Sequence, residues 1–589
     1  MSKFTSIARN YIVPAGRKTD GGLRLAFDTE SDGLLETATT VHCLVIADLD
    51  SDDVYEHGPD QIEAGLAHLR QASYLVGHNN INHDLPLLAR LYDWAPEPDC
   101  IILDTLILGR LILPHLDKLD DEAAARGDPK LGKLRGRYGL EAWGVRLGIP
   151  KVGVDIEDWS QWSPEMQERC VGDAVLTRAV WRLLQPDGYG QDAIALEHRV
   201  APICEQISTL GVPFDRAAAE QLHNQLTARR ATLKKQLAQQ FPGTNLNSRQ
   251  QIAVLLEKRG WVPEKRTEKT KQPKITDEVL ETIATIYPEF AGVSEYYVLG
   301  RRIAQIAGGS KAWCKAVDDN GYIHGGLVHI GTPHSRAKHL DPNLAQVPNP
   351  KKGKLFATEC RVLFRANNDW VFVTADQASL QDRGLAHYLH PFDGGAYSQA
   401  FLAGEDTHWK TTIALGLMPE GSKRDKQSKL HTTLREFGKT FRYAFLYGTG
   451  NARAGHIIYD AVRAAQQIDS TSTLQQKFFG TERPREAAFT RIGGTVKRKF
   501  ELATPGLQKL RLDLERQIAQ RGWLPGLDGR RVPVPAQYVA LNYIICSSEA
   551  IICKYWLVQV YDELCERFDY GWNGDVVIVL WVHDELVCC

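Results

Sequence analysis

The sequence predicts a multidomain α/β protein, and three observations support this prediction. The chain has 589 residues, which exceeds the ~250–300 at which a single core stops growing, so we expect two or more domains. Short apolar runs alternate with helical patterns through residue 192, and the region from Ala193 to about Ala307 is mostly helical. From about Asn320 onward, strand patterns and helix patterns mix again.

Composition excludes some classes of protein without selecting one. Hydrophobic residues make up 43% and charged residues 24%, as in ordinary globular proteins, and the net charge of −2 neither demands nor excludes nucleic acid. No apolar stretch approaches the ~18 residues of a membrane span, and the N-terminus lacks a secretory apolar core. Eleven cysteines occur without CxxC pairs or metal-ligand spacing, which is typical of a reducing compartment.

Four acidic residues stand out in the N-terminal region. Asp28 ends the apolar run LRLAFD, and Glu30 follows two residues later, which places both side chains on one face of a strand. Asp84 ends GHNNINHD, and Asp173 lies in the helical pattern ERCVGDAVLTRAVW. Each alone is typical of a turn or a cap. Together they are the oxygen ligands that two divalent ions need for phosphodiester hydrolysis.

A second constellation lies in the C-terminal region. Asp376 closes VFVTAD, and Asp584 lies at the turn of VVIVLWVHDELV; we expect both runs to form buried strands. Between them, Arg435, Lys439 and Tyr443 recur in steps of four, which places them on one stripe of a helix that continues to Tyr447. Two carboxylates on a sheet opposite two cations and an aromatic ring suit nucleotidyl transfer. The alternative is a salt-bridged amphipathic helix.

These residues resemble the motifs of the family A (Pol I type) DNA polymerases with a 3′→5′ exonuclease. The N-terminal carboxylates follow the order of a DEDD-type exonuclease, and Asp376, the Arg-Lys-Tyr helix and VHDE resemble motifs A, B and C. Further matches are ISTLGVPFD, NLNSRQQIAVLL, DPNLAQVP, GEDTHWK and GLDGRRV. Within the family, LEAWGVRLG, KAWCKAV and ALNYIICSSEAIICK resemble the replicative polymerases of short-tailed T-odd coliphages.

The resemblance implies an RNase H-like exonuclease domain over residues 1–192, followed by a right-hand polymerase. The thumb and the start of the palm would occupy 193–350, and the palm and fingers 351–589. The coliphage thumb carries a large insertion that binds host thioredoxin, and it is missing here between QLAQQFPG and TNLNSRQQ, so we expect no thioredoxin partner. A segment of about 463–493 is inserted after the motif B helix.

The resemblance also implies roles for individual residues. Two Mg²⁺ ions per active site, which Mn²⁺ can replace, would be held by catalytic carboxylates: Asp376 and Asp584 for synthesis, and Asp28, Glu30, Asp84 and Asp173 for hydrolysis. The nucleotide would contact Arg435, Lys439, Tyr443, His408, Gln381 and Tyr447. Primer–template DNA would contact Arg336, Asn542, His583 and Cys546.

Several positions depart from the family pattern. Arg169 stands where a Tyr usually orients the attacking water, Gln381 stands where motif A usually has Glu, and Asp382 follows it in place of an apolar residue. Cys546 replaces a Gln that reads the minor groove. Cys546 is either a packing residue or a sign that the minor groove of the new base pair is checked less strictly. Less strict checking would suit a genome with a modified purine such as 2-aminoadenine. The family continues for several dozen residues past motif C, whereas this sequence ends at Cys589.

We therefore expect a monomeric phage polymerase that acts in the cytoplasm of an infected bacterium. It would bind primer–template DNA and dNTPs, work beside a phage helicase or single-strand binding protein, and have no membrane partner. A host-type repair polymerase is the alternative within enzymes. A catalytically dead DNA-binding or protein-priming scaffold would predict loss of Asp376, Asp584 or the motif B cations, and all are present. A nuclease alone would leave the C-terminal half without a role.

Overall fold

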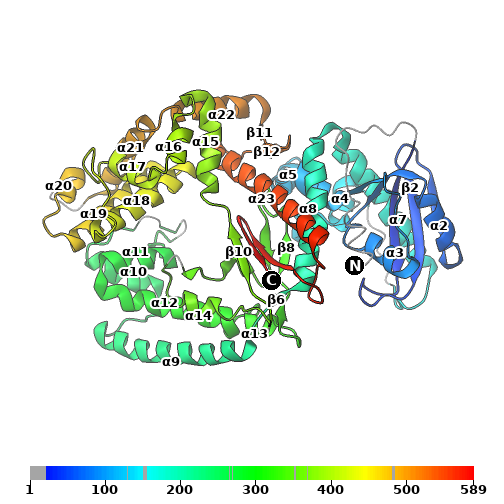
Figure 1. Cartoon of the computed structure of the whole chain (residues 1–589), viewed down its shortest axis with the longest axis horizontal. Helices are drawn as coiled ribbons and strands as arrows, with labels where there is room; N and C mark the ends of the chain where they lie inside the picture. The colour runs from blue at the N-terminus through cyan, green and yellow to red at the C-terminus, as the bar shows by residue number, and fades with distance from the viewer. Residues whose placement is uncertain are drawn as a thin grey trace.

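A computed structural model describes residues 22–128, 130–149, 156–263, 266–267, 270–350, 353–367, 369–480 and 484–589 of the 589-residue chain. An N-terminal unit lies beside a larger part in which two helical lobes flank a three-stranded sheet (Figure 1). The expected non-secretory N-terminal segment lies largely outside the described residues. Along the described residues, no helix is both long enough and apolar enough to cross a membrane.

The N-terminal unit is built on one five-stranded sheet in the order β3-β2-β1-β4-β5. Its strands are β1 (Leu23–Ser31), β2 (Val41–Asp48), β3 (Val54–His57), β4 (Ala72–Gly77) and β5 (Ile101–Asp104). β1 pairs antiparallel with β2 and parallel with β4, and β4 pairs parallel with β5. The helices of this unit are α2 (Ile62–Leu69), α3 (Asp84–Tyr92), α4 (Thr105–Ile112), α5 (Leu116–Ala125), α6 (Leu140–Leu147) and α7 (Pro164–Leu184). The predicted α/β character of this region is confirmed.

The first helical lobe follows the long helix α8 (Gln191–Leu210), which runs without a break across the predicted boundary at residue 192. This lobe consists of α9 (Arg216–Gln240), α10 (Arg249–Lys258), α11 (Asp277–Ile286) and α12 (Ala291–Ile303), so the predicted helical region is confirmed. Short elements lead from it toward the sheet: β6 (Val212–Pro213), α13 (Trp313–Ala316), β7 (Tyr322–Ile323), β8 (Gly326–Val328), β9 (Lys338–Leu340) and α14 (Ala357–Arg361).

The three-stranded sheet has the order β10-β14-β13 and is antiparallel. Its strands are β10 (Val373–Asp376), β13 (Ile578–Val582) and β14 (Glu585–Cys588), and helix α23 (Ala540–Arg567) lies next to it (Figure 1). The prediction that VVIVLWVHDELV forms buried strands is confirmed for most of its apolar residues. The same prediction for VFVTAD is wrong, because β10 is an edge strand: Val371 is 71% exposed and Val373 60%.

The second helical lobe lies between β10 and α23 in the sequence. Its elements are α15 (Leu380–Asp393), α16 (Ala396–Leu402), α17 (Thr407–Ala414), α18 (Lys429–Leu446), α19 (Asn451–Ile468), α20 (Leu474–Phe479), α21 (Glu486–Leu502), α22 (Leu507–Arg521), β11 (Trp523–Pro525) and β12 (Arg531–Pro533). The predicted motif B helix is confirmed as α18, whose N-cap Ser428 accepts a hydrogen bond from the His431 N–H. The proposed insertion at 463–493 covers the end of α19, α20 and the start of α21.

Helices α19 and α21 approach each other very closely through glycine. A Cβ atom on Gly493 would lie 1.8 Å from the carbonyl oxygen of Asn451, and one on Gly455 would lie 2.0 Å from that of Phe489. Between them, the His456 ring stacks on Phe489 with the centroids 4.0 Å apart and the planes at 8°. The segment after α18 is therefore a tightly packed helical pair.

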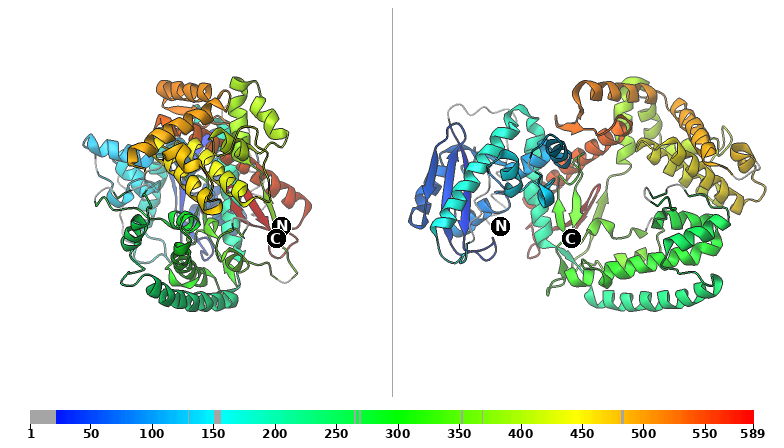
Figure 2. Two further views of the ribbon diagram at one scale, coloured as in Figure 1. Left: turned by 90° about the vertical axis from the view of Figure 1, so that its left-hand side faces the viewer. Right: turned by 180° about the vertical axis from the view of Figure 1, so that it is seen from behind.

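The two helical lobes touch each other at the side opposite the N-terminal unit (Figures 1 and 2). Helix α11 packs against α19, and the guanidinium of Arg463 lies over the ring of Tyr287 at 5.7 Å. A cavity of about 380 Å³ lies at this junction and is lined by both lobes, including Trp261 and Asp460. The contact between α11 and α19 therefore joins the two lobes on the side away from the N-terminal unit.

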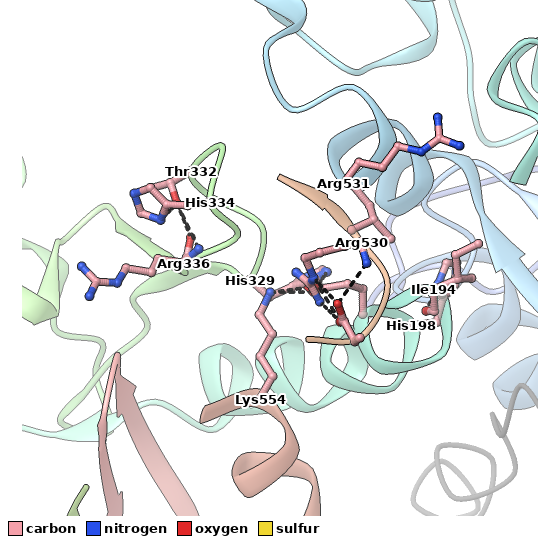
Figure 3. A network of polar contacts seen from close by, with 12 residues as sticks. Ile194, His198, His329, Thr332, His334, Arg336, Arg530, Arg531 and Lys554 are labelled. Carbon is pink, nitrogen blue, oxygen red and sulfur yellow. Dashed lines mark hydrogen bonds and ion pairs between the residues drawn. The ribbon is translucent and has the colours of Figure 1, made fainter. Parts of the chain in front are cut away.

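A buried charge network connects α8, the helix that follows the N-terminal unit, to the C-terminal part of the molecule (Figure 3). Glu197 on α8 accepts hydrogen bonds from Arg530 at 2.6 Å and from Lys554 on α23 at 2.6 and 2.7 Å. Asp528 accepts from Arg530 at 2.9 Å, and these four side chains are at most 1% exposed. Buried charges require such pairing, so the network fixes α8, α23 and the GLDGRRV segment relative to one another.

Candidate active sites

The first candidate site lies at the end of β1 in the N-terminal unit. Asp28 and Glu30 project from this strand toward Asp173 on α7, and one ligand atom from each of the three lies within 4.8 Å of the others. The N-cap Ser163 and Pro164 start α7, and Cys170 holds it against β1 by donating to the backbone oxygen of Asp28 at 3.3 Å. Three converging carboxylates fit a hard divalent cation.

The fourth predicted carboxylate, Asp84, binds the residue between Asp28 and Glu30. Asp84 is 5% exposed, and its Oδ1 accepts hydrogen bonds from the backbone N–H of Thr29 at 3.2 Å and from the Thr29 hydroxyl at 2.6 Å. The parallel pairing of β1 with β4 ends at Ala26, so the N–H of Thr29 needs a partner from outside the sheet. Asp84 is therefore not one of the residues whose ligand atoms all lie within 4.8 Å of one another, its predicted role beside the other three stays a prediction, and burial raises its pKa.

Arg169 occupies the position where the sequence departs from the DEDD pattern. Its Nε donates to Glu30 Oε1 at 2.8 Å, and its guanidinium lies over the Trp159 ring at 5.2 Å. The structure thus places a cation against one member of the carboxylate group, an arrangement that the sequence alone did not predict.

The second candidate site lies at the turn of the three-stranded sheet. The register pairs Asp376 on β10 with Glu585 on β14, and the Gln377 N–H donates to the carbonyl oxygen of Asp584 at 2.9 Å. The turn therefore brings the two predicted carboxylates to the same end of the sheet. His583 begins this turn with φ of 57°, a left-handed conformation that non-glycine residues rarely adopt. Arg361 donates to Glu585 at 2.8 Å, so that acid is already paired.

Helix α18 presents the predicted basic and aromatic stripe. Arg435 donates to Asp406 at 2.7 Å, and Asp406 also caps α17 by accepting from the Trp409 N–H at 3.0 Å. His408 on α17 lies beside Tyr443, with the ring centroids 5.8 Å apart. Burial lowers the pKa of His408 to about 4, so its imidazole is neutral at pH 7 and carries one N–H donor.

The two unusual residues of the VTADQASLQD segment both have partners. Gln381 donates to the Tyr447 hydroxyl at 3.0 Å, which links α15 to the end of α18. Asp382 is 4% exposed and accepts two hydrogen bonds from Arg442, at 3.0 and 2.7 Å. An acid in place of an apolar residue at 382 is thus explained by a buried ion pair between α15 and α18.

Of the predicted DNA-contacting residues, Asn542 and Cys546 lie on α23, Arg336 lies on the segment before β9, and His583 lies at the turn between β13 and β14. Cys546 is only 2% exposed, and its thiol lies 3.1 Å from Asn542 Oδ1. This burial agrees with the packing interpretation and does not agree with a direct DNA contact, because the thiol has no open surface to offer. Arg336 forms an ion pair with Glu549, a residue that sequence reasoning missed. The sequence feature that could have identified Glu549 is its position as an isolated acid in the apolar stretch IICSSEAIIC.

Comparisons with known proteins identify the family of this chain. The model of the family described as "DNA polymerase family A" matches residues 216–589. The DNA-directed DNA polymerase of Escherichia phage T7 is 29% identical over 95% of this chain and 93% of its own length, and that of Enterobacteria phage T3 is 29% identical over 96% and 94%.

A solved structure resembles the whole fold. The POL domain of Pol1 from M. smegmatis, in complex with DNA primer-template and dNTP, has a TM-score of 0.65 at 18% identity and covers 96% of this chain and 89% of that chain. On the family match to residues 216–589, this chain belongs to DNA polymerase family A.

Proposed function

We propose that this chain is a DNA-directed DNA polymerase that extends a primer by nucleotidyl transfer at the turn between β13 and β14. The observation that carries the proposal is the strand register. It pairs Asp376 with Glu585, the residue after Asp584, and so places both aspartates at the same end of the sheet. The first helical lobe would act as the thumb, the second as the fingers and the sheet as the palm. The phage relatives fit a replicative role in an infected bacterium.

In this mechanism Asp376 and Asp584 would hold two divalent ions, for which Mg²⁺ is the expected metal. When bound, these ions favour ionisation of the primer 3′-hydroxyl and offset the charge of the triphosphate. Arg435 and Lys439 would bind the triphosphate from the α18 side, and the Arg435–Asp406 pair fixes the direction of that guanidinium. Neutral His408 would donate one hydrogen bond to a phosphate oxygen. Tyr443 and Tyr447 would pack on the incoming nucleotide and near the templating base.

Primer extension tests this proposal directly. The wild-type protein should extend a recessed primer in the presence of Mg²⁺ and dNTPs, and Asp376→Ala or Asp584→Ala should reduce extension by several orders of magnitude. Extension near the wild-type rate in either variant would contradict the assignment of the palm carboxylates.

We also propose a 3′→5′ exonuclease in the N-terminal unit, as an RNase H-like domain. The observation behind this second function is the three-carboxylate group of Asp28, Glu30 and Asp173, which is separate from the palm sheet. Asp84 remains a candidate ligand. Its Oδ1 accepts hydrogen bonds from Thr29, so it would have to bind the metal through its second carboxylate oxygen. The double variant Asp28→Ala/Glu30→Ala should still extend primers but no longer shorten a labelled single strand from its 3′ end. Shortening that persists in this variant would remove the site from the proposal.

A further inference from the structure

Glu549 is a buried carboxylate whose position has no role in the function described so far. It lies in the middle of α23 and is 6% exposed. Burying an ionised acid is costly unless it is paired, so its partner indicates why it is tolerated. That partner is Arg336, whose NH2 group forms an ion pair with Glu549 Oε2 across 213 residues of sequence.

The Arg336–Glu549 pair lies at the polymerase site. Arg336, Glu549 and His583 line one small cavity together with Trp581 and Cys553. Burial raises the pKa of Glu549, the Arg336 charge and hydrogen bonds from Arg336 and Gln381 oppose that rise, and the charge of Asp584 adds to it. Glu549 is therefore close enough to Asp584 and to Gln381 to interact with both.

The contacts argue against two simpler roles for this acid. Glu549 Oε2 already accepts from Arg336, so this oxygen is not free to serve as a third palm ligand. A purely structural pair is also a poor explanation, since replacing a buried ion pair by apolar residues is often neutral or stabilising.

The donors of Arg336 point to a ligand outside the protein. NH2 is bound by Glu549 and the Nε is buried, whereas the Arg336 side chain as a whole is 19% exposed, so part of the guanidinium can still reach a ligand. A guanidinium held at one end by a carboxylate presents its remaining N–H groups in a fixed direction. Minor-groove edges of all four base pairs offer acceptors at purine N3 and pyrimidine O2, so such a donor suits any sequence at a primer end.

We propose that Glu549 is a positioning residue for nucleotidyl transfer, which holds the Arg336 guanidinium against the minor groove at the primer end beside His583. This inference rests on the proposed polymerase function. Glu549 would not touch the reacting atoms. It would act through Arg336, because without the carboxylate a long, flexible arginine side chain samples many rotamers and the primer end is held less accurately.

A double-mutant cycle tests this inference in the full-length protein. We expect Glu549→Ala and Arg336→Ala each to reduce kcat/KM for single-nucleotide extension of a matched primer by ~10- to 100-fold. Because Glu549 acts through Arg336, the double variant should be no slower than Arg336→Ala alone, within about twofold. The isosteric Glu549→Gln, which keeps an acceptor without the charge, should lie between wild type and Glu549→Ala. Fluorescence anisotropy should show weaker binding of primer–template by the same variants.

Controls separate positioning from folding and from failure of the proposed function. Glu501→Gln removes an acid that pairs with Arg511 in the second helical lobe, and it should leave extension unchanged. Thermal unfolding identifies any variant that is simply unstable, and in that case Glu549→Gln carries the test. The inference would be overturned if the reductions in kcat/KM of the two single variants multiply in the double variant. It would also be overturned if Glu549→Ala extends primers as fast as wild type. A wild-type protein that does not extend primers would instead overturn the polymerase assignment.

Discussion

Arg169 on α7 donates its Nε–H to Glu30 Oε1 at 2.8 Å, at the edge of the three-carboxylate group of the N-terminal unit. The side chains are 29% and 12% exposed, so solvent only partly screens the pair. A fixed cation in contact with one ligand of a cation site must oppose the binding of a second cation there. The ion pair therefore predicts a weakened metal site, which is a more specific expectation than the loss of a water-orienting Tyr.

We expect Arg169→Tyr to bind divalent ions more tightly at this site. Removing the cation should favour binding by about 1–2 kcal/mol after screening, or ~5- to 30-fold in affinity. Isothermal titration of Mn²⁺ in an Asp376→Ala/Asp584→Ala background isolates the N-terminal site. Arg182→Ala is the matched control, since this arginine of the same helix pairs with Asp52 at 2.9 Å. Equal affinities of the Arg169 variant and its parent would contradict the prediction.

Glu197→Gln should destabilise the protein strongly. The substitution leaves Arg530 and Lys554 buried with an uncompensated charge, and breaking a buried network of this kind costs about 3–5 kcal/mol. Scanning calorimetry should show a Tm lower by several degrees. Glu295→Gln is the control: its partner Arg229 is 50% exposed, and surface pairs contribute only ~0–1 kcal/mol. Similar Tm values for the two variants would show that the network is not a stabilising junction.

Gly493→Ala should disrupt the packing of α19 against α21. The added Cβ would meet the Asn451 carbonyl oxygen at 1.8 Å, and backbone cannot move aside as a side chain can, so we expect a loss of roughly 1–3 kcal/mol. The neighbouring Gly494 provides a control, because a Cβ there lies 3.3 Å from the Asn451 side chain. Gly494→Ala should be neutral or slightly stabilising in a helix. Thermal unfolding compares the two, and equal effects would refute the close approach.

Acidification should destabilise the second helical lobe through His456. Burial lowers the pKa of His456 from 6.5 to about 4, and the charge of Arg453 adds to this shift. The unfolded chain therefore binds a proton that the folded chain does not, and stability is lost as pH falls from about 6.5 toward 4. His456→Phe keeps a ring to stack on Phe489 and removes the titration. Its Tm should fall less than that of wild type between pH 7 and 5, and identical slopes would contradict the assignment.

Thioredoxin should not increase the length of products made on primed single-stranded DNA. Helix α9 ends at Gln240 and α10 begins at Arg249, so only a short turn connects them and leaves no docking segment. The measurement is the length of the extension products with and without thioredoxin under single-hit conditions, and we expect the two lengths to be equal. A thioredoxin-dependent increase would require a binding surface elsewhere on the chain.

The sequence by itself determined the local features of this protein. Steps of four in Arg435, Lys439 and Tyr443 identified α18, because the period of a helix can be read directly from the order of residues. The alternation of Asp28 and Glu30 likewise placed both on one face of β1. Asp376 and Asp584 were identified by their positions at a strand end and at a turn, and the register of β10 with β14 brings them to one sheet edge.

Only the tertiary structure decided which side chains meet. The apolar run VFVTAD could not reveal that β10 is an exposed edge strand, since exposure depends on what packs against a strand. Asp84 binds Thr29 because the β1–β4 pairing stops at Ala26, a boundary that local periodicity does not record. Glu549 and Arg336 are 213 residues apart and pair because α23 packs against the segment before β9. Contacts at such separations are set by how whole elements pack, and the composition of either segment carries no signal of them.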